Sequence, residues 1–334
     1  MKKLSVQTEK NNYEILFENG LINRINEYIN PNVKKIFIIT DKNVEKLYFN
    51  QLISSLNNYE GQFISLFPGD INKNIENVLL IINKMSQFDM SENDLIISFG
   101  GGVITDIASL CANLYLNGIN YLQIPTTLNA MVNWSLLGKN NVNTRFVKNK
   151  IGTFYPPEKI IIDPLLLQTL DKEHYNNGMA EIIKIAFIKD KMLFEQLEND
   201  YNISEIVFRT VQLHLEIMNN ENKFLNFGNI IGKFIEELEN FNILYGQALS
   251  VGMSVITKNS IKKGFCPVKC LFRLNGLLTK FSLPITYEYE KNNFIDYVKN
   301  QSSINNEIEL VIPTDIGQVK LIKININEIT GWII

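Results

Sequence analysis

The chain has 334 residues, 46% of them hydrophobic and 20% charged, the balance of a globular protein with one large domain or two ordinary ones. A formal net charge of −3 gives no electrostatic reason to bind nucleic acid, and no apolar run is long enough to cross a bilayer. The three cysteines do not form a disulfide framework, and the N-terminus lacks the apolar core of a signal peptide. We therefore expect a cytoplasmic protein with neither nucleic-acid nor membrane partners.

The first half of the chain alternates short apolar runs with helical patterns. Four apolar runs predict strands, at 34–41, 61–70, 93–102 and 120–127. Helical spacing predicts one helix at 74–87 and another from the third strand to Asn117. Alternating strands and helices are typical of a parallel sheet covered on both faces. This half is therefore predicted to be an α/β domain.

Beyond about Pro164 the pattern changes to consecutive helices. Apolar residues recur with the helical period over five segments, 171–189, 203–219, 228–240, 244–262 and 270–281. Near the C-terminus, 307–324 is predicted to form a small hairpin. We place the boundary so that an α/β domain spans 1–168 and a mostly helical domain spans 169–334. The cleft between two such domains is the expected ligand site.

The stretch SFGGGVITD places three glycines, Gly100 to Gly102, between a buried strand and a helix. Glycine there lets the backbone approach a ligand, and a helix N-terminus offers N–H groups to a phosphate. The pattern is neither the six-residue dinucleotide fingerprint nor a Walker A loop, and alone it also fits a plain tight turn. Polar residues near the ends of the predicted strands favour a ligand site, because parallel sheets bind ligands there. These residues are Asp41, Asp70, Lys73, Thr126 and Thr127.

Seven segments, in order, resemble a known family. They are FGGGVITDIASLCANLYLNG, QIPTTLNAMV, GKNNVN, VKNKIGTFYPP, GMAEIIK, LNFG and YGQALSVGM. Together they resemble the signature segments of the 3-dehydroquinate synthase family of sugar phosphate cyclases, over nearly the whole chain. The polyol dehydrogenases share that fold but lack the equivalents of GKNNVN and LNFG.

The resemblance implies a two-domain lyase with tightly bound NAD, usually a homodimer, and with a divalent metal, normally zinc. It also implies a parallel-sheet NAD-binding domain followed by a mostly α-helical substrate and metal domain. Family members convert a seven-carbon phosphorylated keto acid to 3-dehydroquinate, in the shikimate pathway to aromatic amino acids. NAD transiently oxidises a ring alcohol, phosphate is eliminated, the ketone is reduced again, and the ring closes by an aldol step. The metal polarises oxygen at the carbon being oxidised.

Carried over residue by residue, the resemblance retains most NAD-contacting positions. Asp41 and Asn43 match the adenosine side, and Asp70 stands where the family has Glu. The implied NAD-binding residues are Asp41, Asn43, Asp70, Lys73, Gly101, Gly102, Asp106, Thr126, Thr127, Lys139, Lys148 and Thr169. On the substrate side, Lys233 replaces a family His that contacts the substrate phosphate. The candidate catalytic residues are Lys139, Asn149, Glu181, Lys184, Asn226 and Lys233.

The metal-binding positions of the family are not retained. Its Glu ligand is present as Glu181, but its two His ligands are replaced by Asn229 and Tyr245. An amide oxygen and a phenol are poor zinc ligands beside imidazole, and one carboxylate does not hold zinc alone. We therefore expect NAD as a cofactor, and no stoichiometric zinc at this position. Further family positions on the substrate side also differ, at Asn117, Asn133, His214 and Asn222.

Two alternative metal sites that involve Glu181 stay open. His174 lies seven residues before Glu181, so the two could share a helix face and form a metal pair. Glu181 with Asn229 and Gln247 could hold a hard cation weakly. We expect His214 to be an ordinary polar residue facing the cleft or solvent, and the lone Cys111 to lie in the core.

An ionised Glu181 would be costly without a cation beside it. We therefore predict that an ammonium, from Lys233 or Lys184, lies within about 4 Å of Glu181. Asn229 and Tyr245 would then supply hydrogen bonds. Two functions fit this reading. One is a dehydroquinate synthase-like cyclase, or a divergent relative of it, acting on a phosphorylated small molecule. The other is a non-catalytic NAD-binding paralogue, a pseudoenzyme that serves as a binding or partner protein.

Overall fold

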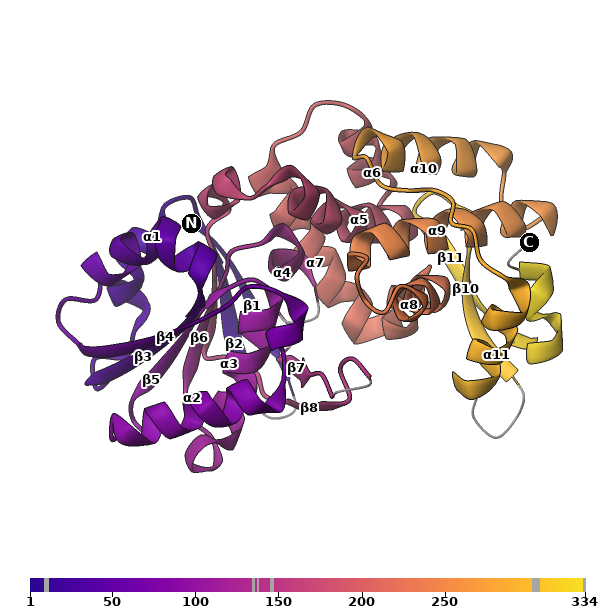
Figure 1. The fold of residues 1–334 in the computed structure, drawn as a ribbon. Coiled ribbons are helices and arrows are strands. Elements are labelled where there is room, and N and C mark those ends of the chain that lie inside the picture. The colour runs from indigo at the N-terminus through magenta and orange to yellow at the C-terminus, as the bar shows by residue number, and fades with distance from the viewer. Residues whose placement is uncertain (9–11, 134–135, 137, 145–146, 302–306, 333–334) are drawn as a thin grey trace. The chain divides into compact units, whose positions relative to one another are not determined.

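The computed structural model describes residues 1–8, 12–133, 136, 138–144, 147–301 and 307–332. The chain divides into two compact units, Met1–Leu170 and Asp171–Ile334, each described by itself below (Figure 1). Within the described ranges, no helix combines the length and the apolar character needed to cross a membrane.

A seven-stranded sheet forms the centre of the N-terminal unit, in the order β1-β2-β9-β6-β5-β3-β4. Its strands are β1 (Lys2–Gln7), β2 (Asn12–Phe17), β3 (Lys35–Asp41), β4 (Glu60–Leu66), β5 (Leu95–Gly100), β6 (Tyr121–Pro125) and β9 (Lys159–Ile162). Every neighbouring pair is parallel except β1 with β2. The predicted parallel sheet is confirmed, and β1, β2 and β9 extend it beyond the four strands predicted.

Helices cover both faces of this sheet (Figure 1). They are α1 (Lys42–Ser54), α2 (Ile75–Gln87) and α3 (Gly102–Leu114). The chain moves outward from β3 to β4 through α1 and returns to β5 and β6 through α2 and α3. Because such crossovers are right-handed, α1 lies on one face and the other two helices lie on the opposite face. Buried Phe37 and Ile96 of the sheet share one hydrophobic cluster with Ile81 of α2 and Ile107 of α3.

A small antiparallel hairpin, β7 (Lys139–Val142) with β8 (Ile151–Phe154), lies beside α3. Its fully buried Asn140 holds it there. The Asn140 Nδ2 donates to Ser109 Oγ of α3 at 2.9 Å, and its Oδ1 accepts from the N–H and the hydroxyl of Thr153 at 3.0 Å. Since the loop of this hairpin carries Lys148 and Asn149, the bonds of Asn140 fix candidate binding residues relative to α3.

Asp163, at the end of β9, is a fully buried carboxylate that holds three backbone N–H groups. It accepts from Gly20 at 2.9 Å, Ile22 at 3.2 Å and Leu165 at 3.1 Å. We expect Asp163→Ala to lower the free energy of unfolding by about 3 kcal/mol or more, because each buried donor left unpaired costs about 1–3 kcal/mol. Denaturant unfolding measures this loss. Glu92 is exposed, so Glu92→Ala is the control. Equal small losses of unfolding free energy in both variants would contradict this role of Asp163.

The C-terminal unit is mostly helical, with a hairpin near its end (Figure 1). Its elements are α5 (Lys172–Lys189), α6 (Lys191–Glu198), α7 (Ile203–Glu221), α8 (Asn229–Leu238), α9 (Tyr245–Lys262), α10 (Val268–Lys280), α11 (Lys291–Gln301), β10 (Glu307–Asp315) and β11 (Gln318–Asn325). The five predicted helices and the predicted hairpin are confirmed. The sequence pattern did not predict α6 or α11.

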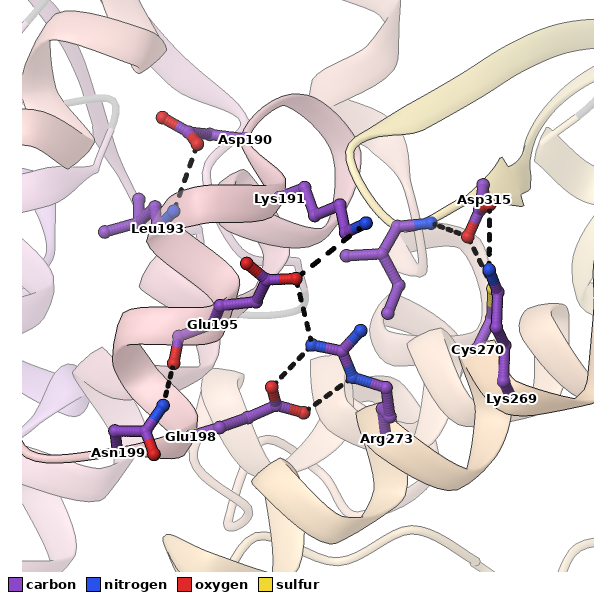
Figure 2. A network of polar contacts seen from close by, with 11 residues as sticks. Asp190, Lys191, Leu193, Glu195, Glu198, Asn199, Lys269, Cys270, Arg273 and Asp315 are labelled. Atoms are coloured by element: carbon purple, nitrogen blue, oxygen red, sulfur yellow. Dashed lines mark hydrogen bonds and ion pairs between the residues drawn. The ribbon is translucent and has the colours of Figure 1, made fainter.

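A polar network joins α6 to α10 (Figure 2). The guanidinium of Arg273 meets the carboxylate of Glu198 through two bonds, at 2.8 Å from Nε and 2.5 Å from Nη2. Glu195 adds a longer ion pair to the same guanidinium, at 3.7 Å. This two-point geometry helps orient α10 on α6, because two parallel bonds between a planar guanidinium and a carboxylate add geometric specificity.

Two expectations about single residues have clear outcomes. Cys111 is fully buried, which confirms its place in the core. His214 is only 2% exposed, so the expectation that it faces solvent is wrong. His214 follows Val207 and Val211 by seven and three residues on α7, which places it on the same apolar face that this helix buries.

Candidate functional site

The glycine turn of the N-terminal unit joins β5 to α3. A Cβ at Gly101 would lie 3.0 Å from the Thr127 side chain, so packing within the unit favours glycine there. A Cβ at Gly102 would meet nothing within 4 Å. Among the described residues no side chain caps the N-terminus of α3. The N–H of Ile104 donates to the Gly101 carbonyl, so the N–H groups of Gly102 and Val103 are the ones that the turn can offer to an anion.

Ion pairs bring the predicted NAD-binding residues of three segments together beside this turn. Lys73 Nζ lies 2.5 Å from Asp106 Oδ2 on α3 and 2.8 Å from Asn149 Oδ1. Lys148 Nζ lies 2.6 Å from Asp70 Oδ2. The segment after β4, helix α3 and the β7–β8 hairpin thus converge on one polar cluster, which we call the lysine–aspartate cluster.

Asn143 joins this cluster, and the sequence reasoning did not single it out. Its Nδ2 donates to the Asp70 carbonyl at 3.1 Å, and its N–H donates to the Lys73 carbonyl at 2.7 Å. Its Oδ1 accepts from the N–H of Asn149 at 3.0 Å. The available signal was its place as the last residue of GKNNVN, directly after a short strand.

The charges of the cluster favour an anion. Burial raises the pKa of Asp106, and the positive charges of Lys73 and Lys139 oppose that rise. Lys73, Lys139 and Lys148 against Asp70 and Asp106 leave one net positive charge. A basic excess beside open helix amides suits a phosphate or pyrophosphate group.

Three further predicted NAD-binding residues of the unit, Asp41, Thr127 and Thr169, make hydrogen bonds within the protein. Asp41 Oδ1 caps α1, because it accepts from the N–H of Asn43 at 2.9 Å and of Val44 at 3.0 Å. Burial raises the pKa of Asp41, and these two amide bonds oppose the rise. Thr127 caps the short helix α4 (Leu128–Val132). Thr169 Oγ1 lies 2.6 Å from the Tyr48 hydroxyl. Their contact with NAD stays a prediction.

In the C-terminal unit, α5 carries Glu181 and Lys184, both fully buried. Lys184 Nζ lies 2.7 Å from Glu181 Oε1, so the predicted ammonium beside Glu181 is confirmed. The structure assigns this place to Lys184. Lys233, the other candidate, is exposed on α8, and Asn226 is exposed in the turn before that helix.

Tyr245 and Asn229 complete the surroundings of Glu181. The Tyr245 phenol has two acceptors within reach, Glu181 Oε2 at 3.1 Å and Asn229 Oδ1 at 3.3 Å. Asn229 Nδ2 donates to the Leu225 carbonyl at 3.2 Å. Burial, and then the Glu181 carboxylate, raises the pKa of Tyr245 well above its usual value. The phenol therefore stays protonated and donates, as predicted, whereas the Asn229 amide hydrogens are directed to the backbone.

Close backbone contacts bring α5, α8 and α9 to this position. A Cβ at Gly246 would lie 2.2 Å from the Asn177 carbonyl oxygen, and one at Gly252 would lie 2.1 Å from that of Gly228. Asn177 Oδ1 accepts from the Gly246 N–H at 2.6 Å and so fixes the start of α9 on α5. Sequence reasoning missed Asn177, although it lies directly before the matched segment GMAEIIK.

The donor set around Glu181 does not fit zinc. It consists of one carboxylate with an ammonium beside it, a protonated phenol and an amide, where zinc prefers imidazole, thiolate and carboxylate. In the described part of the chain, no group of three His, Cys, Asp or Glu side chains could hold a metal ion.

The two open alternatives for a metal at Glu181 do not gain support. His174 is exposed and its Nδ1 lies 3.0 Å from Asp171 Oδ1, about 10 Å along the helix from Glu181. Gln247 Oε1 accepts from the Leu244 N–H at 3.3 Å, and its Nε2 donates to Glu173 at 3.3 Å. The Gln247 amide, which the alternative hard-cation site would need as a ligand, thus already makes two hydrogen bonds within the protein.

Comparisons with known proteins agree with the resemblance. The family model "3-dehydroquinate synthase N-terminal" matches residues 63–177, and "3-dehydroquinate synthase C-terminal" matches 178–302. The 3-dehydroquinate synthase of Clostridium botulinum (strain Alaska E43 / Type E3) is 36% identical, over 98% of this chain and 99% of its own. That of Clostridium acetobutylicum is 34% identical, over 98% of both chains.

Among solved structures, a 2-epi-5-epi-valiolone synthase from Streptomyces hygroscopicus subsp. jinggangensis 5008, with NAD+ and Zn2+ bound, has a TM-score of 0.85 and 26% identity. The match covers 98% of this chain and 96% of that one. A 2-deoxy-scyllo-inosose synthase with carbaglucose-6-phosphate, NAD+ and Co2+ has the same TM-score at 17% identity and 98% coverage of both chains, and shows the shared fold. The chain therefore belongs to the 3-dehydroquinate synthase family, within the sugar phosphate cyclases.

Proposed function

We propose that this protein binds NAD through its N-terminal unit and does not carry out the zinc-dependent formation of 3-dehydroquinate for which its relatives are named. The observation that carries the proposal is the pairing at Glu181. Its carboxylate is neutralised at 2.7 Å by a buried ammonium, and its second oxygen faces a protonated phenol at 3.1 Å. The other side chains around Glu181 are the Asn229 amide and the Tyr245 phenol, where zinc would need imidazoles.

Support for NAD comes from the lysine–aspartate cluster and the glycine turn. Both lie at the carboxyl ends of parallel strands, where open α/β sheets bind ligands. The valiolone synthase of the same fold has NAD+ bound. The contrast between the two units is the basis of the proposal. Polar groups suited to a dinucleotide are kept, whereas the groups suited to a metal are replaced.

A non-catalytic role is a specific alternative to a metal-free enzyme. Lys184 corresponds to a substrate-side position of the family, yet here its ammonium is engaged inside the protein by Glu181. An ammonium engaged by Glu181 is less available to a phosphorylated substrate. Of the two functions, this favours the first, a protein that keeps NAD and acts as a binding or partner protein. It disfavours the second, a divergent cyclase.

NAD binding is expected in calorimetry on nucleotide-free protein. The double variant Asp106→Ala/Lys148→Ala should weaken NAD binding about a hundredfold or more, because hydrogen bonds to charged groups contribute about 1.5–3 kcal/mol each and every 1.4 kcal/mol is a factor of ten. Lys46→Ala, an exposed lysine on α1, is the control and should bind like the wild type. Unchanged affinity of the double variant would place the nucleotide elsewhere on the protein.

A further inference from the structure

A pocket with a volume of about 300 Å³ lies in the C-terminal unit, where the first turns of α5 and α9 meet the turn that follows α10. Its lining includes Gln247 of α9 and Ser282 and Leu283 after α10, and residues of α5 form the rest. None of the residues predicted above to bind NAD or to take part in catalysis lines this pocket. Its volume is at the lower end of the range of ligand pockets, so it suits a small molecule.

Asn176 is the residue of this pocket that points to a ligand. Its side chain is 9% exposed, yet it makes no hydrogen bond with any residue that the structure describes. The next residue, Asn177, is equally buried, but its Oδ1 accepts from the Gly246 N–H at 2.6 Å. Buried amides are normally paired, because an unpaired one costs stability. Asn176 therefore offers both a donor and an acceptor to whatever occupies the pocket.

The rim of the pocket carries one charge of each sign. Lys172 and Glu173 are the first two residues of α5, and both are exposed. The Lys172 ammonium makes no ion pair with the described residues. Glu173 Oε1 accepts from Gln247 Nε2 at 3.3 Å, which orients the carboxylate and leaves Oε2 available. The rim can thus receive a carboxylate at Lys172 and an ammonium at Glu173.

The start of α5 strengthens the positive side of this rim. The Asp171 side chain caps the helix by accepting from the His174 N–H only, so the N–H groups of Lys172 and Glu173 stay uncapped. Uncapped N–H groups give a helix N-terminus a partial positive charge, which favours a carboxylate nearby. Opposite this polar side, the buried Leu283 gives the pocket an apolar wall.

We propose that this pocket binds a free α-amino acid with an apolar side chain. The carboxylate of the amino acid pairs with Lys172, and its ammonium pairs with Glu173. The Asn176 amide donates to the carboxylate, and Leu283 packs against the apolar side chain. A zwitterion fits because the rim has both charges and no net charge. This site is additional to the proposed NAD site and does not depend on it.

Calorimetric titration of the full chain with L-leucine tests the proposal. L-leucine should bind at one site per chain. Two analogues of the same shape, 4-methylpentanoate without the ammonium and 3-methylbutylamine without the carboxylate, should each bind at least about tenfold more weakly. No binding of L-leucine at millimolar concentrations would overturn the proposal. Equal binding of either analogue would also overturn it, because a zwitterion would then not be required.

Variants of the rim and of the buried amide locate the site. Lys172→Met and Glu173→Gln should each weaken L-leucine binding about threefold, because exposed charges contribute modestly. Asn176→Ala should weaken it about tenfold, because its amide is buried. Lys191→Met is the matched control, since Lys191 follows the cap of α6 as Lys172 follows that of α5. Unchanged binding by Asn176→Ala, or weaker binding by Lys191→Met, would overturn the assignment.

Thermal unfolding without ligand separates a binding role of Asn176 from a structural one. Asn176→Ala should leave Tm within about 2 °C of the wild type, because it removes no hydrogen bond within the protein. Asn177→Ala should lower Tm by about 5 °C, because it leaves the Gly246 N–H unpaired. A loss in Asn176→Ala as large as that in Asn177→Ala would show a structural amide and overturn the proposal. These measurements involve neither NAD nor turnover, so their failure is distinguishable from failure of the proposed function.

Discussion

With NAD, zinc and the family substrate supplied, this protein should form 3-dehydroquinate at no more than about a thousandth of the rate of a relative that has Glu and two His at positions 181, 229 and 245. A metal acting as a Lewis acid contributes several kcal/mol of transition-state stabilisation, and each 1.36 kcal/mol is a factor of ten in rate. Release of inorganic phosphate and appearance of 3-dehydroquinate, followed in parallel, measure the turnover.

Two controls make that result decisive. A relative with the complete ligand set should lose its activity on treatment with EDTA and regain it with zinc, which shows that the assay reports metal chemistry. This protein should show the same low rate in both conditions. Rapid product formation by metal-stripped protein would contradict the inference that the chemistry is lost, and would establish a metal-free cyclase.

Restoring both histidines should create a zinc site. The variant Asn229→His/Tyr245→His is expected to bind about one zinc per chain, on the order of a thousandfold more tightly than the wild type. Two imidazoles with the Glu181 carboxylate form a three-ligand set of the catalytic type, and metal affinity follows ligand number and type. Competition with a chromogenic chelator measures this affinity without reference to activity.

The two single variants and the triple variant with Glu181→Gln are the controls. Each single variant has only two suitable ligands and should bind zinc far more weakly. The triple variant should lose the gain, because it removes the carboxylate. Circular dichroism must show intact helices, since Asn229→His also removes the bond from Asn229 to the Leu225 carbonyl. Tight zinc binding that persists in the triple variant would place the ion elsewhere.

The sequence predicted those parts of the fold where the apolar pattern is strong. The buried strand Leu95–Gly100 and the helix Lys172–Lys189 are long apolar or periodic segments, and both were predicted to within two residues. β1 was missed because it lies at the sheet edge with one buried residue in six, which leaves little alternation to detect. α6 was missed because eight residues give barely two turns of periodicity.

At the candidate site, the sequence predicted residue types but not their final partners. It indicated that Glu181 needs a cation, yet Lys184 and Lys233 were equal candidates until burial separated them. Asn229 was expected to supply a hydrogen bond beside Glu181. Its Nδ2 donates to the Leu225 carbonyl, because a side chain at the start of a helix competes for nearby backbone groups, and its Oδ1 lies within reach of the Tyr245 phenol. Such choices depend on three-dimensional distances that spacing does not encode.

The glycine contacts at Gly228, Gly246 and Gly252 have a consequence for how this protein could have evolved. They hold the backbones of α5, α8 and α9 so closely that no side chain fits between them, and they involve none of the substituted ligand positions. The backbone frame around Glu181 thus does not depend on the side chains at positions 229 and 245. Mutations at Asn229 and Tyr245 can accumulate or revert without collapsing the frame, so natural selection can remove or rebuild a metal site by a few point substitutions.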